Sequence, residues 1–390
     1  MLKNPFMVYV ATFGGVIALY QLGWSEIYPT LSSDLLLFFG LTFLSAILLA
    51  WIISPLLMRT AEYQPGLLPK YTGLLVVATF AGEIALAGGI PLLLVIGGAK
   101  FYQLEASASH LHAFVLWSVF STIRFADFMY SRRPIYLLEA MLPVIFYGLL
   151  LYRGPAIICL LSWAFVFVIR HGGVRTRHAF LGAISAIAMF YLNGLMGDVR
   201  SPGQENIGVP SDEFRESGVP QTFFWTYLYA TVGMANFQLS VDRLAGNQGD
   251  GAEFVASDLL PDTISKRILP LLNEGILSDG GNLQSRDQLY SWEQPQVSRG
   301  LNVSTIFGRS YGIFGWIGPV ILFVALSFFI VIYLILIRRS PYQVPCLALL
   351  NTLVVLCLFN NMIASAAMLP PLILPLLLPP WWARVRARMA

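Results

Sequence analysis

The stretch Phe314–Ile337, FGWIGPVILFVALSFFIVIYLILI, carries no charged side chain from end to end. A helix of about 20 mostly apolar residues is long enough to cross the hydrocarbon core of a membrane. Other stretches approach or exceed that length, so the sequence predicts an all-α, polytopic membrane protein of about ten transmembrane helices. The remaining predicted spans are Pro5–Leu22, Leu35–Leu57, Gly73–Ile96, Leu111–Met129, Pro134–Tyr152, Pro155–Ile169, Ala179–Met196, Val344–Asn360 and Ala366–Trp382.

The overall composition supports this interpretation. Of the 390 residues, 57% are hydrophobic and only 12% are charged, whereas a soluble domain has about 25% charged residues. So few charged groups cannot cover the surface of a chain this long, and lipid must therefore solvate much of it. The cysteines Cys159, Cys346 and Cys357 all fall inside predicted spans, where they are expected to be small apolar packing residues.

The basic residues predict how the chain is oriented. With the N-terminus in the cytoplasm, most Lys and Arg residues of the short segments lie on the cytoplasmic side, and few lie in the short external loops. Membrane proteins retain positive residues on the cytoplasmic side. Both termini are therefore expected to be cytoplasmic. The cytoplasmic set includes Lys3, Arg59, Lys70, Arg132, Arg133, Arg170, Arg175, Arg177, Arg338 and Arg339, against Lys100 and Arg153 outside.

The polar residues divide the chain into three parts. Residues 1–196 form a first membrane bundle of about seven spans, and residues 312–390 form the last three spans and a basic cytoplasmic tail. Between them, residues 197–311 form one large external loop. Within it, Thr222–Leu239 is predicted to be a helix at the outer membrane interface, and Leu259–Leu272 a short amphipathic helix. Long loops in compact proteins are usually functional, so chemistry is expected here.

Three stretches of this sequence together resemble the Wzy-type O-antigen polymerases, which join oligosaccharide repeat units in bacterial inner membranes. The order of the stretches and the predicted topology also agree with that family. The first stretch is Glu83-Ile-Ala-Leu-Ala-Gly-Gly-Ile-Pro-Leu with Tyr102 and His112 downstream. The second is Gly197-Asp-Val-Arg200-Ser. The third comprises Trp225-Thr-Tyr-Leu-Tyr, Ala235-Asn-Phe and the run from Asn302 to Gly318.

The resemblance implies a glycosyltransferase at the periplasmic face. Such an enzyme moves a growing glycan from its undecaprenyl diphosphate carrier onto the sugar end of a new lipid-linked repeat unit. The implied partners are this lipid-linked oligosaccharide, the lipid bilayer and a chain-length regulator protein, with no nucleic acid. No His/Cys metal pattern or phosphate-binding Gly-rich loop is present, so no metal or cofactor is expected.

Two alternatives remain open. An O-antigen ligase, which transfers glycan to lipid A–core, is similar in topology but has a functional His in its large loop. Residues 197–311 contain no His. A lipid or glycan transporter is suggested by intramembrane ionisable residues, although no internal repeat is evident. These residues are Glu83, Arg124, Asp127 and Glu139; Arg124 and Asp127 also have the spacing of a structural pair on one helix face.

Arginines are the main candidates for catalysis. Transfer of a sugar from a diphosphate leaves negative charge on the departing group, and a guanidinium can pair with two phosphate oxygens at once. Arg200 and Arg309 each adjoin a predicted span, and Arg299 lies nearby in sequence. Their alternative role is contact with solvent or lipid headgroups. Lys266 and Arg267 are candidates for substrate binding or for anchoring an interfacial helix.

A general base is expected near the same surface, because the acceptor hydroxyl must lose a proton. Asp198, His112 and Glu83 are the candidates. Each has a structural alternative: Asp198 can cap the end of a helix, His112 can hydrogen-bond to backbone at a helix start, and Glu83 can be held in a buried ion pair or hydrogen bond.

Aromatic and polar residues are candidates for binding the substrate. Trp225, Tyr227 and Tyr229 can stack on sugar rings, or they can form an aromatic belt at the membrane interface. Tyr102 and Asn302 join this set because they lie in the stretches that carry the family resemblance.

Overall fold

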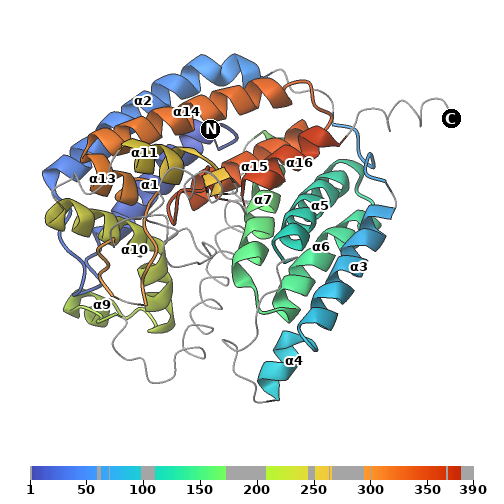
Figure 1. Cartoon of the computed structure of the whole chain (residues 1–390), viewed down its shortest axis with the longest axis horizontal. Helices are drawn as coiled ribbons and strands as arrows, with labels where there is room; N and C mark the ends of the chain where they lie inside the picture. The colour runs from blue at the N-terminus through green and yellow to red at the C-terminus, as the bar shows by residue number, and fades with distance from the viewer. Residues whose placement is uncertain are drawn as a thin grey trace.

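The computed structural model describes residues 2–58, 63–69, 71–97, 110–172, 208–244, 251–262, 264–265, 294–298, 300–365 and 368–378. Every regular element in these residues is helical, and the β-type pairing found there is an isolated bridge between Ser25 and Pro210. The prediction of an all-helical chain is therefore confirmed for the described part of the protein (Figure 1).

Several of the helices are suited to a membrane. Within the described ranges, four helices are long and apolar enough to cross one: Ser33–Pro55, Tyr71–Ile96, Gly154–His171 and Ile317–Ile337. Shorter apolar helices cover Pro5–Tyr20, Pro134–Leu149 and Gln343–Leu356. The prediction of a helical membrane protein is confirmed at this level. The predicted span Ala179–Met196 lies outside the described residues.

One group of helices joins distant parts of the chain. It consists of α1 (Pro5–Tyr20), α2 (Ser33–Met58), α10 (Thr222–Arg243), α13 (Gly308–Phe314) and α14 (Ile317–Ile337). In this group α1 packs on α2 and α10, and α13 packs on α10 and α14. Aromatic rings fill the space between these helices, since edge-to-face and stacked rings pack densely. The buried rings in contact include Tyr9, Phe13, Phe39, Phe237 and Phe307.

A second group is formed by consecutive helices, drawn from blue-cyan to green in Figure 1. Its central helix, α5, contacts α3, α6 and α7. Trp117 of α5 is fully buried and donates a hydrogen bond from Nε1 to Oγ1 of Thr79 on α3 at 2.8 Å. The members are α3 (Tyr71–Leu86), α4 (Pro91–Ile96), α5 (His110–Ser131), α6 (Pro134–Leu149) and α7 (Arg153–His171).

The helix α15 (Gln343–Leu356) connects the two groups. It contacts α5 and α7 on one side and α1 and α14 on the other, and nearly all of its residues are buried. Thr352 and Ser162 of α7 share a hydrogen bond at 2.9 Å. The shorter α16 (Leu369–Leu377) packs on α5 and α15. Because α15 is enclosed by protein, its apolar residues form the centre of the molecule.

The candidate span Tyr71–Ile96, predicted from the sequence as Gly73–Ile96, consists of two helical segments, α3 and α4. Gly88 and Gly89 have φ angles of 71° and 154°, a region that residues with a Cβ rarely adopt. Pro91 then begins α4, and proline at a first helical position lacks only an N–H that would have no partner within the helix. The sequence Gly-Gly-Ile-Pro therefore ends one helix and starts the next.

The outward faces of α2 and α14 are strongly apolar. On α2, Trp51 is 77% exposed, and Leu44 and Leu48 are also exposed. On α14, Val324 and Phe328 are exposed in the same way. A contiguous apolar surface of this kind marks contact with a membrane or a partner. These faces are therefore suited to lipid.

The described part of the predicted external loop contains helices of different lengths. α9 (Asp212–Glu216) is a single turn capped by the Ser211 side chain, and α11 (Gly251–Phe254) leads into a π-helical turn, η2 (Val255–Leu259). α10 is longer than the predicted helix Thr222–Leu239, and residues 231–240 are completely buried by protein. This burial arises because α1 and α13 pack against it.

Candidate functional site

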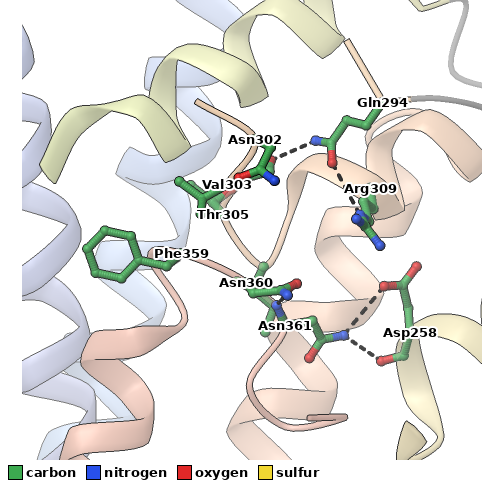
Figure 2. A pocket seen from close by; sticks show the side chains of 11 residues that line it. Asp258, Gln294, Asn302, Val303, Thr305, Arg309, Phe359, Asn360 and Asn361 are labelled. Atoms are coloured by element: carbon green, nitrogen blue, oxygen red, sulfur yellow. Dashed lines mark hydrogen bonds between the residues drawn. The ribbon is translucent and has the colours of Figure 1, made fainter. Parts of the chain in front are cut away.

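A cavity of about 220 Å³ lies where four segments of the chain meet. Its walls come from the segment before α13, from α13 itself, from η2 and from the loop that follows α15. Figure 2 shows the side chains around it. The lining residues are Asp258, Gln294, Asn302, Val303, Ser304, Thr305, Ile306, Arg309, Phe359, Asn360 and Asn361.

The segment before α13 is held in place by Asn236 of α10. The side-chain Nδ2 of Asn236 donates to the carbonyl oxygens of Leu301 and Val303, both at 2.7 Å, and its Oδ1 accepts from the backbone N–H of Val297 at 2.9 Å. One buried amide thus satisfies three backbone groups of a segment without regular structure. Such groups must find partners when they are removed from water.

Close packing of backbone joins the same segment to α10 and to the loop after α15. The N–H of Thr305 donates to the carbonyl of Gly233 at 3.4 Å, and the N–H of Ile306 donates to the carbonyl of Cys357 at 2.8 Å. A Cβ atom on Gly233 would overlap the carbonyl oxygen of Leu358. Glycine is therefore required where α10 touches the loop that carries part of the cavity wall.

Arg309 projects from the first turn of α13. Its Nε donates to Oε1 of Gln294 at 3.3 Å, and Nε2 of Gln294 donates to the hydroxyl of Ser304 at 2.7 Å. Figure 2 shows this chain of hydrogen bonds along one wall. The guanidinium is thereby oriented by the neutral side-chain amide of Gln294, which the Ser304 hydroxyl holds in place in turn.

The wall of the cavity also contains Asp258, which is only 2% exposed. Nδ2 of Asn361 donates to the backbone carbonyl of Asp258 at 2.7 Å and lies 3.5 Å from its Oδ1. The Ser257 hydroxyl approaches the other carboxylate oxygen at 3.4 Å. The N–H of Asn361 donates to Oδ1 of Asn360 at 2.8 Å. The carboxylate is thus fixed relative to the loop after α15.

The chemistry of the cavity follows from these groups. Among the described residues that line it, Arg309 and Asp258 are the two that carry a formal charge. The side-chain amides of Gln294, Asn302 and Asn360 and the ring of Phe359 add neutral hydrogen-bonding and stacking surface. One cation, one carboxylate and several amides can bind a ligand that has an anionic group together with hydroxyl groups.

Two residues predicted from the sequence, Arg309 and Asn302, line this cavity together. Asp198, Arg200 and Tyr102 lie outside the described residues. The same applies to the other candidate cations, Lys266, Arg267 and Arg299.

The predicted aromatic residues lie on α10, away from the lining of the cavity. Tyr227 is buried, and its ring packs with those of Trp24, Tyr28 and Phe224. Burial raises the pKa of the Tyr227 hydroxyl to about 12, so this group stays protonated. Trp225 and Tyr229 are half-buried on another side of the helix, with ring centroids 6.4 Å apart. The packing of Tyr227 on Trp24 and Tyr28 joins α10 to the 21–32 loop.

The two remaining candidate bases belong to the second helix group. Glu83 lies in the last turn of α3, is 6% exposed and lies close enough to Tyr152 for an electrostatic interaction. His112 lies in the first turn of α5. Because α3 packs on α5 and α6, Glu83 is not among the residues that line the cavity around Arg309.

Three of the four intramembrane charged residues that suggested a transporter, Arg124, Asp127 and Glu139, form one network. Arg124 pairs with Asp127 at 3.1 Å and with Glu139 at 2.8 Å. Asp127 also accepts from the hydroxyl of Tyr63 and from the N–H of Gly66, both at 2.8 Å. These bonds tie the α2–α3 loop to α5 and α6, which is the arrangement expected of a structural ion pair.

Sequence reasoning did not single out several cavity residues. Asp258 lies just before the predicted helix Leu259–Leu272, and the pair Asn360-Asn361 ends the predicted span Val344–Asn360. The sequence feature that could have indicated them is the pair Asn360-Asn361 at the predicted external end of an apolar run. Gln294 has no distinguishing sequence context.

Comparisons with protein-family models, with curated proteins and with solved structures found no match. The function is therefore argued from the chemistry of the cavity and from the sequence.

Proposed function

We propose that the protein is a glycosyltransferase that polymerises undecaprenyl-diphosphate-linked oligosaccharide repeat units at the periplasmic face of the bacterial inner membrane. The observation that carries the proposal is the cavity that Arg309 and Asn302 line together with Asp258. The sequence also makes Arg309 a candidate ligand for a diphosphate, because it adjoins a predicted span. Amides around a single cation and a single carboxylate suit a substrate that is part sugar and part phosphate.

The position of the cavity along α14 supports this proposal. α14 has 21 residues and rises about 1.5 Å per residue, so its ends lie roughly 30 Å apart, which is the thickness of the hydrocarbon core. Arg338 and Arg339 follow one end, and α13 with Arg309 precedes the other. In the predicted orientation the cavity would lie at the outer membrane surface, at the depth of a lipid diphosphate headgroup.

The chemistry asked of Arg309 is electrostatic. The bond between the anomeric carbon and the phosphate oxygen breaks, and negative charge builds up on the departing diphosphate. A guanidinium that is already oriented by Gln294 stabilises that charge without reorganisation, an effect that is worth about 100- to 1,000-fold in rate for one donor. In this proposal arginines supply the positive charge and no metal is needed.

The proposal includes the complete topology. It comprises ten spans, cytoplasmic termini and a periplasmic loop over residues 197–311. Arg200 and Arg299 of that loop are proposed to join Arg309 at the diphosphate. Tyr102, Trp225 and Tyr229 are further proposed contacts for the glycan, and Lys266 and Arg267 for the lipid headgroup. A chain-length regulator is the proposed protein partner.

The alternative functions predict different products. A ligase would add one glycan to lipid A–core, and a transporter would leave the glycan unchanged. The closed network around Arg124 favours the enzyme, because its three charged groups pair with one another. A transporter pathway would instead need charged groups that exchange partners with the cargo.

Product analysis tests the proposal. The purified protein is reconstituted in vesicles with a lipid-linked repeat unit, in the presence and absence of a metal chelator. We expect a ladder of products that grows by one repeat unit at a time and persists with the chelator. Products that contain a single transferred glycan on added lipid A–core would identify a ligase. Unchanged glycan would exclude both enzymes.

A further inference from the structure

Two consecutive arginines form the turn between α5 and α6. Arg132 has a φ of 60°, a left-handed conformation that costs energy for a residue with a Cβ and that is retained most often at functional sites. Its N–H donates to the carbonyl of Phe128 at 2.7 Å, which closes the last turn of α5. Arg133 follows, and Pro134 then begins α6. Both arginines are exposed, so the turn presents two adjacent cationic residues at the end of this helix pair.

A third arginine reaches the same turn from α7. The guanidinium carbon of Arg170 lies 4.6 Å from the centroid of the Tyr130 ring. Tyr130 is two residues before Arg132, so this cation–π contact holds Arg170 beside the turn. Arg170 is also exposed. Arg132, Arg133 and Arg170, which we call the turn arginines, therefore gather at one end of α5, α6 and α7.

The acidic residues of these helices do not neutralise the turn arginines. α5 and α6 contain one carboxylate each, Asp127 and Glu139, and both pair with Arg124. The sequence of α7 contains no acidic residue. Within the part of the chain that the structure describes, no ion pair includes a turn arginine. Their positive charge is therefore available to an anion from outside these helices.

An apolar stripe continues from the turn along the outer face of α6. Ile135, Leu138, Met141 and Ile145 are between 41% and 61% exposed, and residues three or four apart lie on one side of a helix. From Ile135 to Ile145 the helix rises about 15 Å, which is half of the roughly 30 Å hydrocarbon core of a membrane. The stripe is therefore as deep as one membrane leaflet, the depth that the acyl chains of a lipid occupy.

We infer that the turn arginines and the apolar stripe of α6 together bind one phospholipid with an anionic headgroup. The guanidinium groups pair with phosphate oxygens, and the acyl chains lie along α6. The turn arginines alone would suit a soluble anion, and the stripe alone would suit any lipid. Their succession along the helix suits a ligand that carries both negative charge and hydrocarbon.

This site is separate from the cavity around Arg309, because none of its residues lines that cavity. The inference therefore does not depend on the proposed function. In the predicted orientation, this end of the helices faces the cytoplasmic leaflet, whose anionic lipids attract basic segments. The bound lipid would fix the α5–α6 turn and thereby stabilise the second helix group.

Lipid binding to the purified protein in detergent tests the inference. Dioleoyl phosphatidylglycerol and dioleoyl phosphatidylcholine are titrated separately, and bound lipids are counted by native mass spectrometry. We expect phosphatidylglycerol to bind at one site about tenfold more tightly than phosphatidylcholine, since only the former has a net negative charge. Glycerol phosphate at the same concentration should not displace it, because it lacks acyl chains. Equal affinity for the two lipids, or displacement by glycerol phosphate, would overturn the inference.

Paired substitutions locate the site. Each basic residue beside an anionic lipid contributes about fivefold in affinity, so Arg132→Gln with Arg133→Gln should weaken phosphatidylglycerol binding about 30-fold. Arg338→Gln with Arg339→Gln is the matched control. It removes two adjacent exposed arginines from the end of α14 and should leave the affinity unchanged. Equal weakening by the two double variants would show that any basic surface attracts the lipid, and it would overturn the inference.

A single substitution covers the case in which Arg132→Gln with Arg133→Gln does not fold. Arg170→Gln changes an exposed residue near the end of α7 and should weaken phosphatidylglycerol binding about fivefold. The midpoint of thermal unfolding gives a second readout. Phosphatidylglycerol should raise it for the wild-type protein and raise it less for Arg170→Gln, because binding to the folded state stabilises that state. Wild-type affinity and stabilisation in Arg170→Gln would overturn the inference.

Discussion

The side-chain amide of Asn236 holds in place the backbone segment that forms one wall of the cavity. Asn236 is 1% exposed, and it makes three hydrogen bonds of 2.7–2.9 Å to backbone groups of residues 297–303. The substitution Asn236→Ala would leave two carbonyl oxygens and one N–H without their partner. Those groups belong to an irregular segment, so no neighbouring helical turn can supply replacement hydrogen-bond partners.

The expected loss of stability follows from the number of backbone groups that lose their partner. Each buried polar group left without a partner costs about 1–3 kcal/mol. With the lower value for each of the three groups, because Val297 and Val303 are only half-buried, the free energy of unfolding should fall by about 3 kcal/mol. Asn302→Ala is the matched control. Its side chain is exposed, so we expect a change within about 0.5 kcal/mol.

The assay is equilibrium unfolding of the purified protein in mixed micelles, followed by tryptophan fluorescence as the fraction of denaturing detergent rises. Glycan polymerisation is measured on the same preparations. Asn236→Ala should unfold at a lower fraction of denaturing detergent and lose polymerisation, because the segment that leads to Arg309 is released. If Asn236→Ala and Asn302→Ala unfold alike, the reasoning about the buried amide is refuted.

Further predictions use the same unfolding assay. Gly233→Ala should lower the free energy of unfolding by about 1–3 kcal/mol, because its methyl group overlaps backbone of the loop after α15. Gly40→Ala, which has open space at its Cβ, should be neutral or stabilising and serves as the control. Asp127→Ala should cost about 3 kcal/mol, since it breaks a buried pair with Arg124. Tyr63→Phe removes one hydrogen bond to the same carboxylate and should cost about 1 kcal/mol. Equal stability of the last two variants would contradict a structural role for this network.

The apolar runs predicted the helices well, because a chain in lipid must satisfy every backbone group within a helix. The run Phe314–Ile337 corresponds to α14, although α14 begins only at Ile317. Gly315 has a φ of 54° and ends α13 before α14 begins. Helix ends depend on single residues such as this one, and an apolar run of uniform composition does not reveal them.

Burial of α10 could not be read from its sequence. Residues Thr231–Ser240 mix small, polar and apolar side chains, which suggested an interfacial helix. In the structure α1 and α13 enclose this part of α10. Both partners are distant in sequence, so the local pattern contains no sign of them.

The residues of the cavity could likewise be predicted only in part, because some of them are brought together from distant parts of the chain. Arg309 and Asn302 were predicted because they lie close to a predicted span and within stretches that resemble a family. Asp258 and Asn361, by contrast, are separated by 103 residues and meet through hydrogen bonds of the folded chain. A lone Asp in a polar loop is usually a solvated residue. Its significance depends on the elements that bring it to the same cavity as Arg309.

The claim that a lipid diphosphate donor binds at Arg309 has a direct test. The rate of repeat-unit polymerisation is measured for the purified wild-type protein, for Arg309→Ala and for Arg215→Ala. Arg215 is the matched control because it lies in the same predicted loop, is 54% exposed and pairs with Asp212. Arg309→Ala should slow polymerisation by about 100- to 1,000-fold, with Arg309→Lys between it and wild type, and Arg215→Ala should keep the wild-type rate. Full polymerisation by a folded Arg309→Ala protein would contradict the account.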